Sequence, residues 1–268
     1  MAGAPLPSEL SIVARLGQLV PVFILGSAIA SYILVFGSLT WSQHTNFGTF
    51  GFDMGIYDQG IWLLSQFERP FVTVRGLHYF GHHANFSTLL LVPFYWLGAG
   101  PRFLYLFETV VLAAGAIPIW LIGRHLLNNA WIALAPAIAY LLYPSLEWIN
   151  WWHFHPDALI ITPLLFAWWF ASIERWRWFI AAVILALMAK EDAAIAVATM
   201  GVLIAVRAGF TGSEASQETG IGSHQRSKFM QWVFSTIDKK GVAAGLSTAV
   251  AGIAWWMACT KLIIPYFN

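Results

Sequence analysis

Residues 19–40 read LVPVFILGSAIASYILVFGSLT, and this stretch contains no charged side chain. About 20 apolar residues in a helix are enough to cross the ~30 Å hydrocarbon core of a bilayer. We therefore expect residues 19–41 to form a transmembrane helix. The apolar run is too long for a signal peptide, and no clean cleavage site follows it, so we interpret it as an uncleaved anchor.

The composition of the whole chain points to the same class of protein. Of the 268 residues, 59% are apolar and only 10% are charged, whereas about 25% of residues are charged in an average soluble domain. These values exclude a soluble globular protein, and the high hydrophobicity excludes a disordered one. The net charge of +1 gives no field that would attract nucleic acid. The single cysteine, Cys259, excludes an intrachain disulfide and a thiolate metal cluster.

Further apolar runs predict an all-α, polytopic helical membrane protein with about seven transmembrane helices. These runs cover residues 103–122, 131–146, 158–173, 179–206 and 242–264. The run 179–206 has Lys190, Glu191 and Asp192 at its centre. In one straight helix each of these charges would cost at least ~2.5 kcal/mol at mid-bilayer. We favour a hairpin of two short helices with the charges at the turn; a single span is the alternative.

The runs predict a single integral membrane domain over residues 1–268. Its expected parts are a first span 19–41, an outer loop 42–102, a helical bundle 103–206, a cytoplasmic linker 207–240 and a last span 241–264. In the outer loop, residues 53–67 carry apolar residues at helical spacing and predict an interfacial helix, with Asp53 as its N-cap. Residues 85–97 are apolar but too short to span, so we expect a re-entrant helix.

The distribution of Lys and Arg predicts the orientation, because cytoplasmic loops are enriched in both. With a cytoplasmic N-terminus, a re-entrant segment 85–97 and a hairpin at 179–206, basic residues divide nine inside to five outside. The inside set is Arg15, Arg124, Arg175, Arg177, Arg207, Arg226, Lys228, Lys239 and Lys240, and the outside set is Arg69, Arg75, Arg102, Lys190 and Lys261. This predicts a multi-pass protein of the cytoplasmic (inner) membrane. It also places four polar clusters on one outer face.

Two of the four clusters lie in the outer loop. Asp53 and Asp58 are five residues apart, which turns them to different sides of a helix. Asp53 is a candidate general base at the lipid–water boundary, and its alternative role is the helix cap. Arg75 begins the second cluster, which continues to His82 and His83. Neutral imidazoles ligate metals, but adjacent histidines in a turn are also common interfacial side chains.

The other two clusters lie in predicted turns of the bundle. His153, His155 and Asp157 form a candidate divalent-metal set, and the alternative is an aromatic belt with Asp157 at a helix N-terminus. Lys190 is a candidate partner for a lipid phosphate, and the alternative is a salt bridge within Lys190–Asp192. We assign Arg75, Lys190, Asp58, Glu191 and Asp192 to a candidate substrate or phosphate site.

The order of these motifs resembles a known family. F-D-x-G-I-Y-D-Q at Phe52–Gln59 is followed by R-G-L-x-x-F-G-x-H at Arg75–His83, a Tyr-Pro turn, H-F-H-P-D-A-L at His153–Leu159 and K-E-D at Lys190–Asp192. In this order they resemble a family of prokaryotic polytopic membrane proteins, the domain of unknown function numbered two thousand and seventy-nine. The resemblance runs from about Asp53 to Asp192.

That family is in turn similar to the GT-C glycosyltransferases, which use sugars linked to lipid phosphates. The resemblance implies that Asp53 is the acidic catalytic residue of the first outer loop, that His82 or His83 is a metal ligand and that Asp157 is a later carboxylate of the site. Asp53 is followed by Met-Gly and not by the second acidic residue usual in GT-C enzymes. Such proteins usually continue with further spans, so we expect this chain to be the N-terminal part of a longer architecture.

The sequence thus predicts a GT-C-like membrane protein that uses a polyprenyl-phosphate-linked sugar at the outer face. Its expected partners are membrane lipid and that lipid-linked sugar, with no nucleic acid. A divalent metal would be held by His82, His83, His153, His155 and Asp157. The alternative is a transporter or a non-catalytic lipid-binding protein, whose charges would line a path near the midplane.

Overall fold

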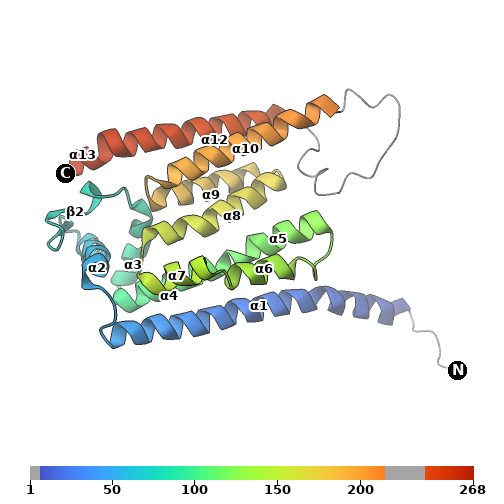
Figure 1. The fold of residues 1–268 in the computed structure, drawn as a ribbon, viewed down its shortest axis with the longest axis horizontal. Helices are drawn as coiled ribbons and strands as arrows, with labels where there is room; N and C mark the ends of the chain where they lie inside the picture. The colour runs from blue at the N-terminus through green and yellow to red at the C-terminus, as the bar shows by residue number, and fades with distance from the viewer. Residues whose placement is uncertain (1–6, 215–238) are drawn as a thin grey trace.

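The structure is a computed structural model, and it describes residues 7–214 and 239–268, with side chains described for 19–209 and 240–268. Its long helices lie side by side with roughly aligned axes (Figure 1). At one end of these helices, which we call the loop end, lie α2, a small hairpin, α3 and the C-terminal residue (Figure 1). The N-terminus of α1 points away from the opposite end (Figure 1).

Three helices of the described ranges are long and apolar enough to cross a membrane. They are Leu19–Thr45, Pro101–Leu127 and Lys240–Phe267. Four shorter apolar helices accompany them: Phe86–Tyr95, Pro156–Ser172, Trp176–Ala189 and Ala193–Gly209. The prediction of an all-α, multi-pass membrane protein is confirmed by these elements.

The first span belongs to a longer helix, α1 (Pro7–Thr45). Its apolar part, Leu19–Thr45, has 27 residues, which is ~40 Å of helix and more than a bilayer core requires. Leu25 and Tyr32 are buried against the neighbouring helices, whereas Phe23 and Leu34 are 71% and 72% exposed. The exposed apolar side of α1 is the surface expected to face lipid.

The segment after α1 folds into short elements at the loop end. These are α2 (Gly51–Ser65), β1 (Phe71–Val72), β2 (Leu77–His78), the 3-10 turns η1 (Tyr79–Gly81) and η2 (Phe86–Leu91), and α3 (Val92–Tyr95). The predicted interfacial helix 53–67 exists but starts at Gly51, so Asp53 lies in its first turn and the N-cap is Phe50. The prediction of Asp53 as N-cap is therefore wrong. The predicted helix 85–97 is a 3-10 turn followed by one α-turn at Pro93.

Two apolar runs are each divided between two helices in the structure. Residues 103–122 fall into α4 (Pro101–Ala114) and α5 (Ala116–Leu127), and Gly115 between them keeps helical angles of φ −61° and ψ −21°, so the two helices form the one long span Pro101–Leu127. The hydroxyl of Tyr140 occupies the space that a Cβ at Gly115 would need. Residues 131–146 fall into α6 (Leu134–Leu141) and α7 (Pro144–Trp152). Pro144 explains this break, because a proline disfavours helical conformation in the residue before it.

The remaining helices confirm the predicted hairpin. The turn η3 (Pro156–Ile160) leads into α8 (Ile161–Ser172), and then α9 (Trp176–Ala189) and α10 (Ala193–Glu214) are separated at Lys190–Asp192. The predicted linker 207–240 is helical up to Glu214 and again from Lys239, and its other residues lie outside the described ranges. The chain ends in α12 (Lys239–Ala258), a π-turn η4 (Cys259–Ile263) and α13 (Ile264–Phe267).

Helices α10 and α12 approach each other closely through small residues. A Cβ at Gly201 would lie 2.5 Å from the backbone nitrogen of Ala249, and one at Gly252 would lie 2.8 Å from the carbonyl oxygen of Ala194. Small residues let helix backbones pack closely where lipid removes the hydrophobic drive for helix association. This contact fixes the loop-end turn before α10 relative to the last helix.

Candidate functional site

The predicted polar clusters meet at the loop end. The chain reaches this end after α1, again between α7 and η3, and again between α9 and α10, because these helices alternate in direction (Figure 1). Two short polar contacts join the loop after η1 and the turns before η3 and α10. These contacts bring the second, third and fourth predicted clusters together.

The first contact joins Lys190 to Asp157. Lys190 Nζ lies 2.8 Å from Asp157 Oδ1 and 3.7 Å from Asp192 Oδ2. Lys190 is extended, with φ −164° and ψ 156°, and this conformation ends α9. Burial lowers the pKa of Lys190, but its hydrogen bond and charge attraction to Asp157 outweigh burial and raise the pKa above its usual value. Lys190 is therefore a cation, and Asp157 occupies one of its three N–H donors.

The second contact joins His83 to Glu191. His83 Nδ1 lies 2.6 Å from Glu191 Oε1, and the backbone N–H of Ala84 donates to Glu191 Oε2 at 3.0 Å. Glu191 is only 6% exposed. Burial raises the pKa of Glu191, but the hydrogen bonds from His83 and Ala84 outweigh burial, so the pKa lies below its usual value. The carboxylate binds the loop after η1 to the α9–α10 turn.

His82 and Arg75 lie beside this contact. The rings of His82 and His83 are 3.9 Å apart. Burial and the neighbouring His83 and Arg75 lower the pKa of His82 to about 4, so its ring is neutral at pH 7. Arg75 is exposed between β1 and β2. This hairpin is held against α2 by Gln59 Oε1, which accepts hydrogen bonds from the backbone N–H and hydroxyl of Thr73.

Asp53 lies next to the His153–His155 turn. It is half-buried in the first turn of α2, and its charge acts to raise the pKa of His153. Burial and His155 dominate, so the pKa of His153 is lowered overall. The rings of Phe50 and His153 are 5.1 Å apart, and those of Tyr57 and His155 are 5.5 Å apart. The start of α2 therefore places the Asp53 carboxylate beside the third cluster.

Asp58 has a different environment from Asp53. Its Oδ1 accepts a hydrogen bond of 2.8 Å from the hydroxyl of Tyr95. Burial raises the pKa of Asp58, and the Tyr95 hydrogen bond offsets only part of this effect. Asp58 thus joins α2 to α3, and its contact with a substrate stays a prediction.

The family of the chain follows from a match along almost its whole length. Residues 24–268 match the model of the family described as "Predicted membrane protein (DUF2079)". The chain belongs to this family. No match was found among curated proteins or among solved structures.

In this DUF2079 protein three of the five predicted metal ligands contact other groups. His83 contacts Glu191, Asp157 contacts Lys190, and His155 Nδ1 lies 3.1 Å from the carbonyl oxygen of His153. Within residues 7–214 and 239–268, no three His, Cys, Asp or Glu side chains gather in a way that could hold a metal ion. A divalent metal at the predicted ligands therefore stays a prediction.

The sequence interpretation missed Glu108 on α4. Glu108 is 0% exposed, and neither of its carboxyl oxygens has a hydrogen-bond partner among the described residues. The backbone of His155 lies beside it without closing a hydrogen bond of standard geometry. His153, 1% exposed, also has two ring nitrogens without a partner there. The signal was present in the sequence, since Glu108 is the single charge in the run 103–122, and intramembrane charges are usually functional.

Proposed function

We propose that this DUF2079 protein is a glycosyltransferase-like membrane protein that uses a polyprenyl-phosphate-linked sugar at the outer face of the cell membrane. One observation carries the proposal. The contacts Lys190–Asp157 and His83–Glu191 gather three polar segments at the ends of the helices and not midway along them. A polar surface at that level suits a lipid whose phosphate lies at the membrane boundary and whose chain lies in the bilayer.

The proposed reaction assigns a role to each charged group. The oxygen of an acceptor hydroxyl attacks the anomeric carbon, and the bond between that carbon and the phosphate oxygen breaks. The lipid phosphate leaves with the bonding electrons, and the hydroxyl proton passes to Asp53. Lys190, through its remaining N–H groups, and Arg75 stabilise the charge that develops on the phosphate.

The availability of Asp53 supports its role as the base. Its carboxylate is half-buried, and no hydrogen bond or ion pair within the described residues occupies it. Asp157 and Glu191 are already engaged by Lys190 and His83. Among the acidic groups predicted for the site, Asp53 is therefore the one best placed to accept a proton from a bound hydroxyl.

The orientation and number of spans are part of the same proposal. We place the loop end outside, the N-terminus in the cytoplasm and about seven helices across the inner membrane. Basic residues support this orientation because many lie at the opposite end of the helices, at the end of α5, in the α8–α9 turn and late in α10. These are Arg124, Arg175, Arg177 and Arg207. Such residues favour the cytoplasmic side.

Glu108 favours a second candidate, an ion-coupled transporter. A carboxyl group that is completely buried among helices and has no hydrogen-bond partner is costly as an isolated anion. Proton relays and coupling sites in transporters use such groups. A transporter would lose its activity in Glu108→Gln and keep it in Asp53→Asn, whereas the proposed transferase requires Asp53.

The proposed function is tested with purified protein in lipid nanodiscs and polyprenyl-phosphate-linked sugars carrying a labelled sugar. We expect release of the sugar to an acceptor, and a loss of at least about 100-fold in Asp53→Asn, the range general-base catalysis contributes. Glu68→Gln is the matched control, since Glu68 is exposed in the same outer segment. Equal transfer by Asp53→Asn and the unaltered protein would remove Asp53 from the reaction.

A further inference from the structure

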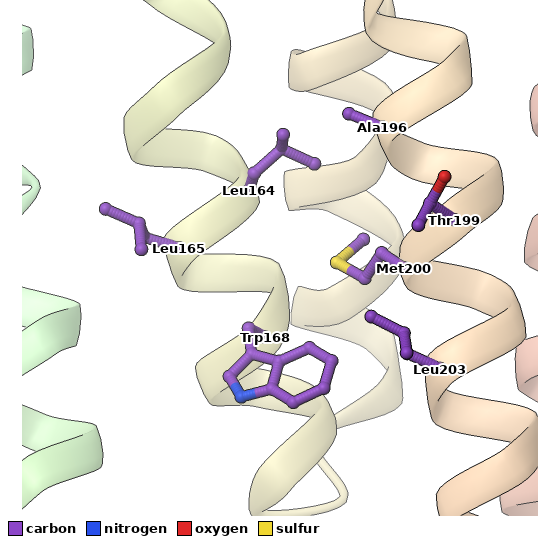
Figure 2. A pocket seen from close by; sticks show the side chains of 7 residues that line it. All are labelled: Leu164, Leu165, Trp168, Ala196, Thr199, Met200 and Leu203. Atoms are coloured by element: carbon purple, nitrogen blue, oxygen red, sulfur yellow. The ribbon is translucent and has the colours of Figure 1, made fainter.

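An apolar groove runs between α8 and α10, away from the polar site. Leu164, Leu165 and Trp168 line it from α8, and Ala196, Thr199, Met200 and Leu203 line it from α10 (Figure 2). The groove has a volume of about 360 Å³, which lies in the range of about 300–1,000 Å³ found for ligand sites. It is open along one side. Such a groove accepts a ligand from the surroundings of the helices.

Polar contacts bracket the groove at both ends. Near the loop end, Lys190 in the turn before α10 reaches Asp157 in the turn before α8. Near the opposite end, Arg207 Nη1 on α10 lies 3.5 Å from the hydroxyl of Ser172 on α8. The two helices are thus held together at their ends, and the apolar space remains between these contacts.

The lining selects a hydrocarbon and not a polar ligand. Six of its seven side chains are apolar, and the hydroxyl of Thr199 donates to the carbonyl oxygen of Ile195 on its own helix. A buried water needs two to four polar partners, which this lining does not offer. The neighbouring side chains Ile195 and Val202 are 59% and 50% exposed, as expected for a lipid-facing helix surface. A hydrocarbon chain would restore the packing contacts that an empty groove loses.

The position of the groove relates it to the polar site. Ala196 follows Asp192 by four residues, so the groove begins ~6 Å along α10 from the charged turn. From Ala196 to Leu203 it extends over ~10 Å. Its volume of about 360 Å³ is near the lower limit for ligand sites, which favours one hydrocarbon chain over two. A ligand with a phosphate at Lys190 and a single chain below it matches both parts.

We propose that the α8–α10 groove holds the hydrocarbon chain of a single-chain lipid phosphate whose phosphate group binds Lys190. The inference rests on the lipid-phosphate part of the proposed function and not on sugar transfer. The ion pair with Asp157 leaves N–H donors on Lys190 for the phosphate. Ala196, the lining residue of α10 nearest the charged turn in sequence, has a small side chain.

Binding is measured by isothermal titration of the detergent-purified full chain with farnesyl phosphate, farnesol and inorganic phosphate. We expect farnesyl phosphate to bind at least about tenfold more tightly than either part alone. A diacyl phosphatidic acid provides a fourth arm, and we expect it to bind more weakly because the groove admits one chain. Equal binding of inorganic phosphate and farnesyl phosphate, or tighter binding of the diacyl lipid, would overturn the proposal.

Variants separate the groove from the polar site. Ala196→Phe fills the end of the groove nearest the charged turn. It should weaken the binding of farnesyl phosphate and of farnesol at least about tenfold. Ala251→Phe, the same change at an exposed position of α12, should leave both unchanged. Lys190→Gln should weaken the binding of farnesyl phosphate but not the binding of farnesol. If Ala196→Phe does not fold, Leu203→Trp shortens the groove from the other end and should likewise weaken the binding of farnesyl phosphate and of farnesol. Unchanged binding in the folded groove variant would refute the assignment.

A failed sugar-transfer assay does not decide this inference, because binding is measured without any sugar. Conversely, sugar transfer that persists when Ala196→Phe abolishes farnesol binding would separate the groove from catalysis. The binding result and the transfer result thus test the two proposals independently.

Discussion

Glu191 keeps its charge inside the protein because two donors replace the water that burial removes. His83 and the backbone N–H of Ala84 each bond one of its carboxylate oxygens. An ionised carboxylate without such partners would be strongly disfavoured at 6% exposure. The same two hydrogen bonds fix the position of His83 and Ala84. The single side chain of Glu191 therefore ties the α9–α10 turn to the loop after η1.

Replacing Glu191 by alanine should therefore destabilise the fold as well as the site. The change leaves the Ala84 N–H buried without a partner, and a buried unsatisfied group costs about 1–3 kcal/mol. Thermal unfolding in detergent measures the loss. Asp192→Ala is the matched control, because the Asp192 side chain is 60% exposed and surface changes usually cost less than about 0.5 kcal/mol. Equal effects of the two changes would contradict the role given to Glu191.

His82 makes the stability of the protein sensitive to acid. Burial, His83 and Arg75 lower its pKa from 6.5 to about 4. Between these values the unfolded chain binds a proton that the folded protein excludes, so stability falls as the pH drops from about 6.5 to about 4. We expect the unfolding temperature to decrease over this range, and His82→Gln to reduce the decrease. The same slope in His82→Gln and the unaltered protein would assign the effect to other groups.

At the scale of the element, helix breaks follow local chemistry more than hydrophobic run length. Gly115 divides the long run 103–122 where the Tyr140 hydroxyl packs against it, and Pro144 divides 131–146. Both residues are visible in the sequence. The reason for the break at Gly115 is not visible there, because Tyr140 lies on another helix.

The close contact of α10 with α12 should tolerate no side chain at Gly201. Leucine at this position would push the two backbones apart, because a Cβ already lies 2.5 Å from the Ala249 nitrogen. Overpacking costs about 1–3 kcal/mol and sometimes more. Thermal unfolding of Gly201→Leu checks this. Gly26→Leu is the control, since nothing lies within 4 Å of a Cβ there. A Gly201→Leu protein as stable as this control would show that α10 and α12 are not in contact.

At the scale of the whole molecule, the helices separate two chemically different ends. The loop end carries the contacts of Lys190 and Glu191, whereas the other carries the arginines of the α8–α9 turn. A membrane between them would hold the apolar helices and expose each end to a different compartment. The proposed orientation can be tested by labelling cysteines placed at the two ends.

We expect a membrane-impermeant maleimide to label Asp192→Cys in intact cells and Arg177→Cys only after the membrane is opened. Both positions are exposed: Asp192 lies in the α9–α10 turn, and Arg177 lies in the first turn of α9. Cys259, the native cysteine, is 0% exposed and is replaced by alanine in both proteins. Labelling of Arg177→Cys in intact cells, with Asp192→Cys protected, would establish the opposite orientation.

The sequence predicted which residues belong to the candidate site better than it predicted which of them contact one another. The polar clusters stood out because charged residues are rare in an apolar chain. The helix hairpin at Lys190–Asp192 was predicted because burying these three charges at mid-bilayer is costly. Adjacent residues, such as Lys190 and Glu191, nevertheless contact different partners. Lys190 pairs with Asp157 and, as the predicted bridge within Lys190–Asp192 requires, also with Asp192, whereas Glu191 pairs with His83.

The sequence by itself determined that this protein is helical and belongs in a membrane. The reason is that the free-energy cost of exposing an apolar side chain to water is a property of each residue. It also determined where the charged turns fall. Only the tertiary structure decided which turns touch, that Glu108 is enclosed beside the backbone of His155, and that α8 and α10 leave an apolar groove. These features depend on how helices distant in the chain pack together, and side-chain volume and backbone approach set that packing only once the helices have assembled.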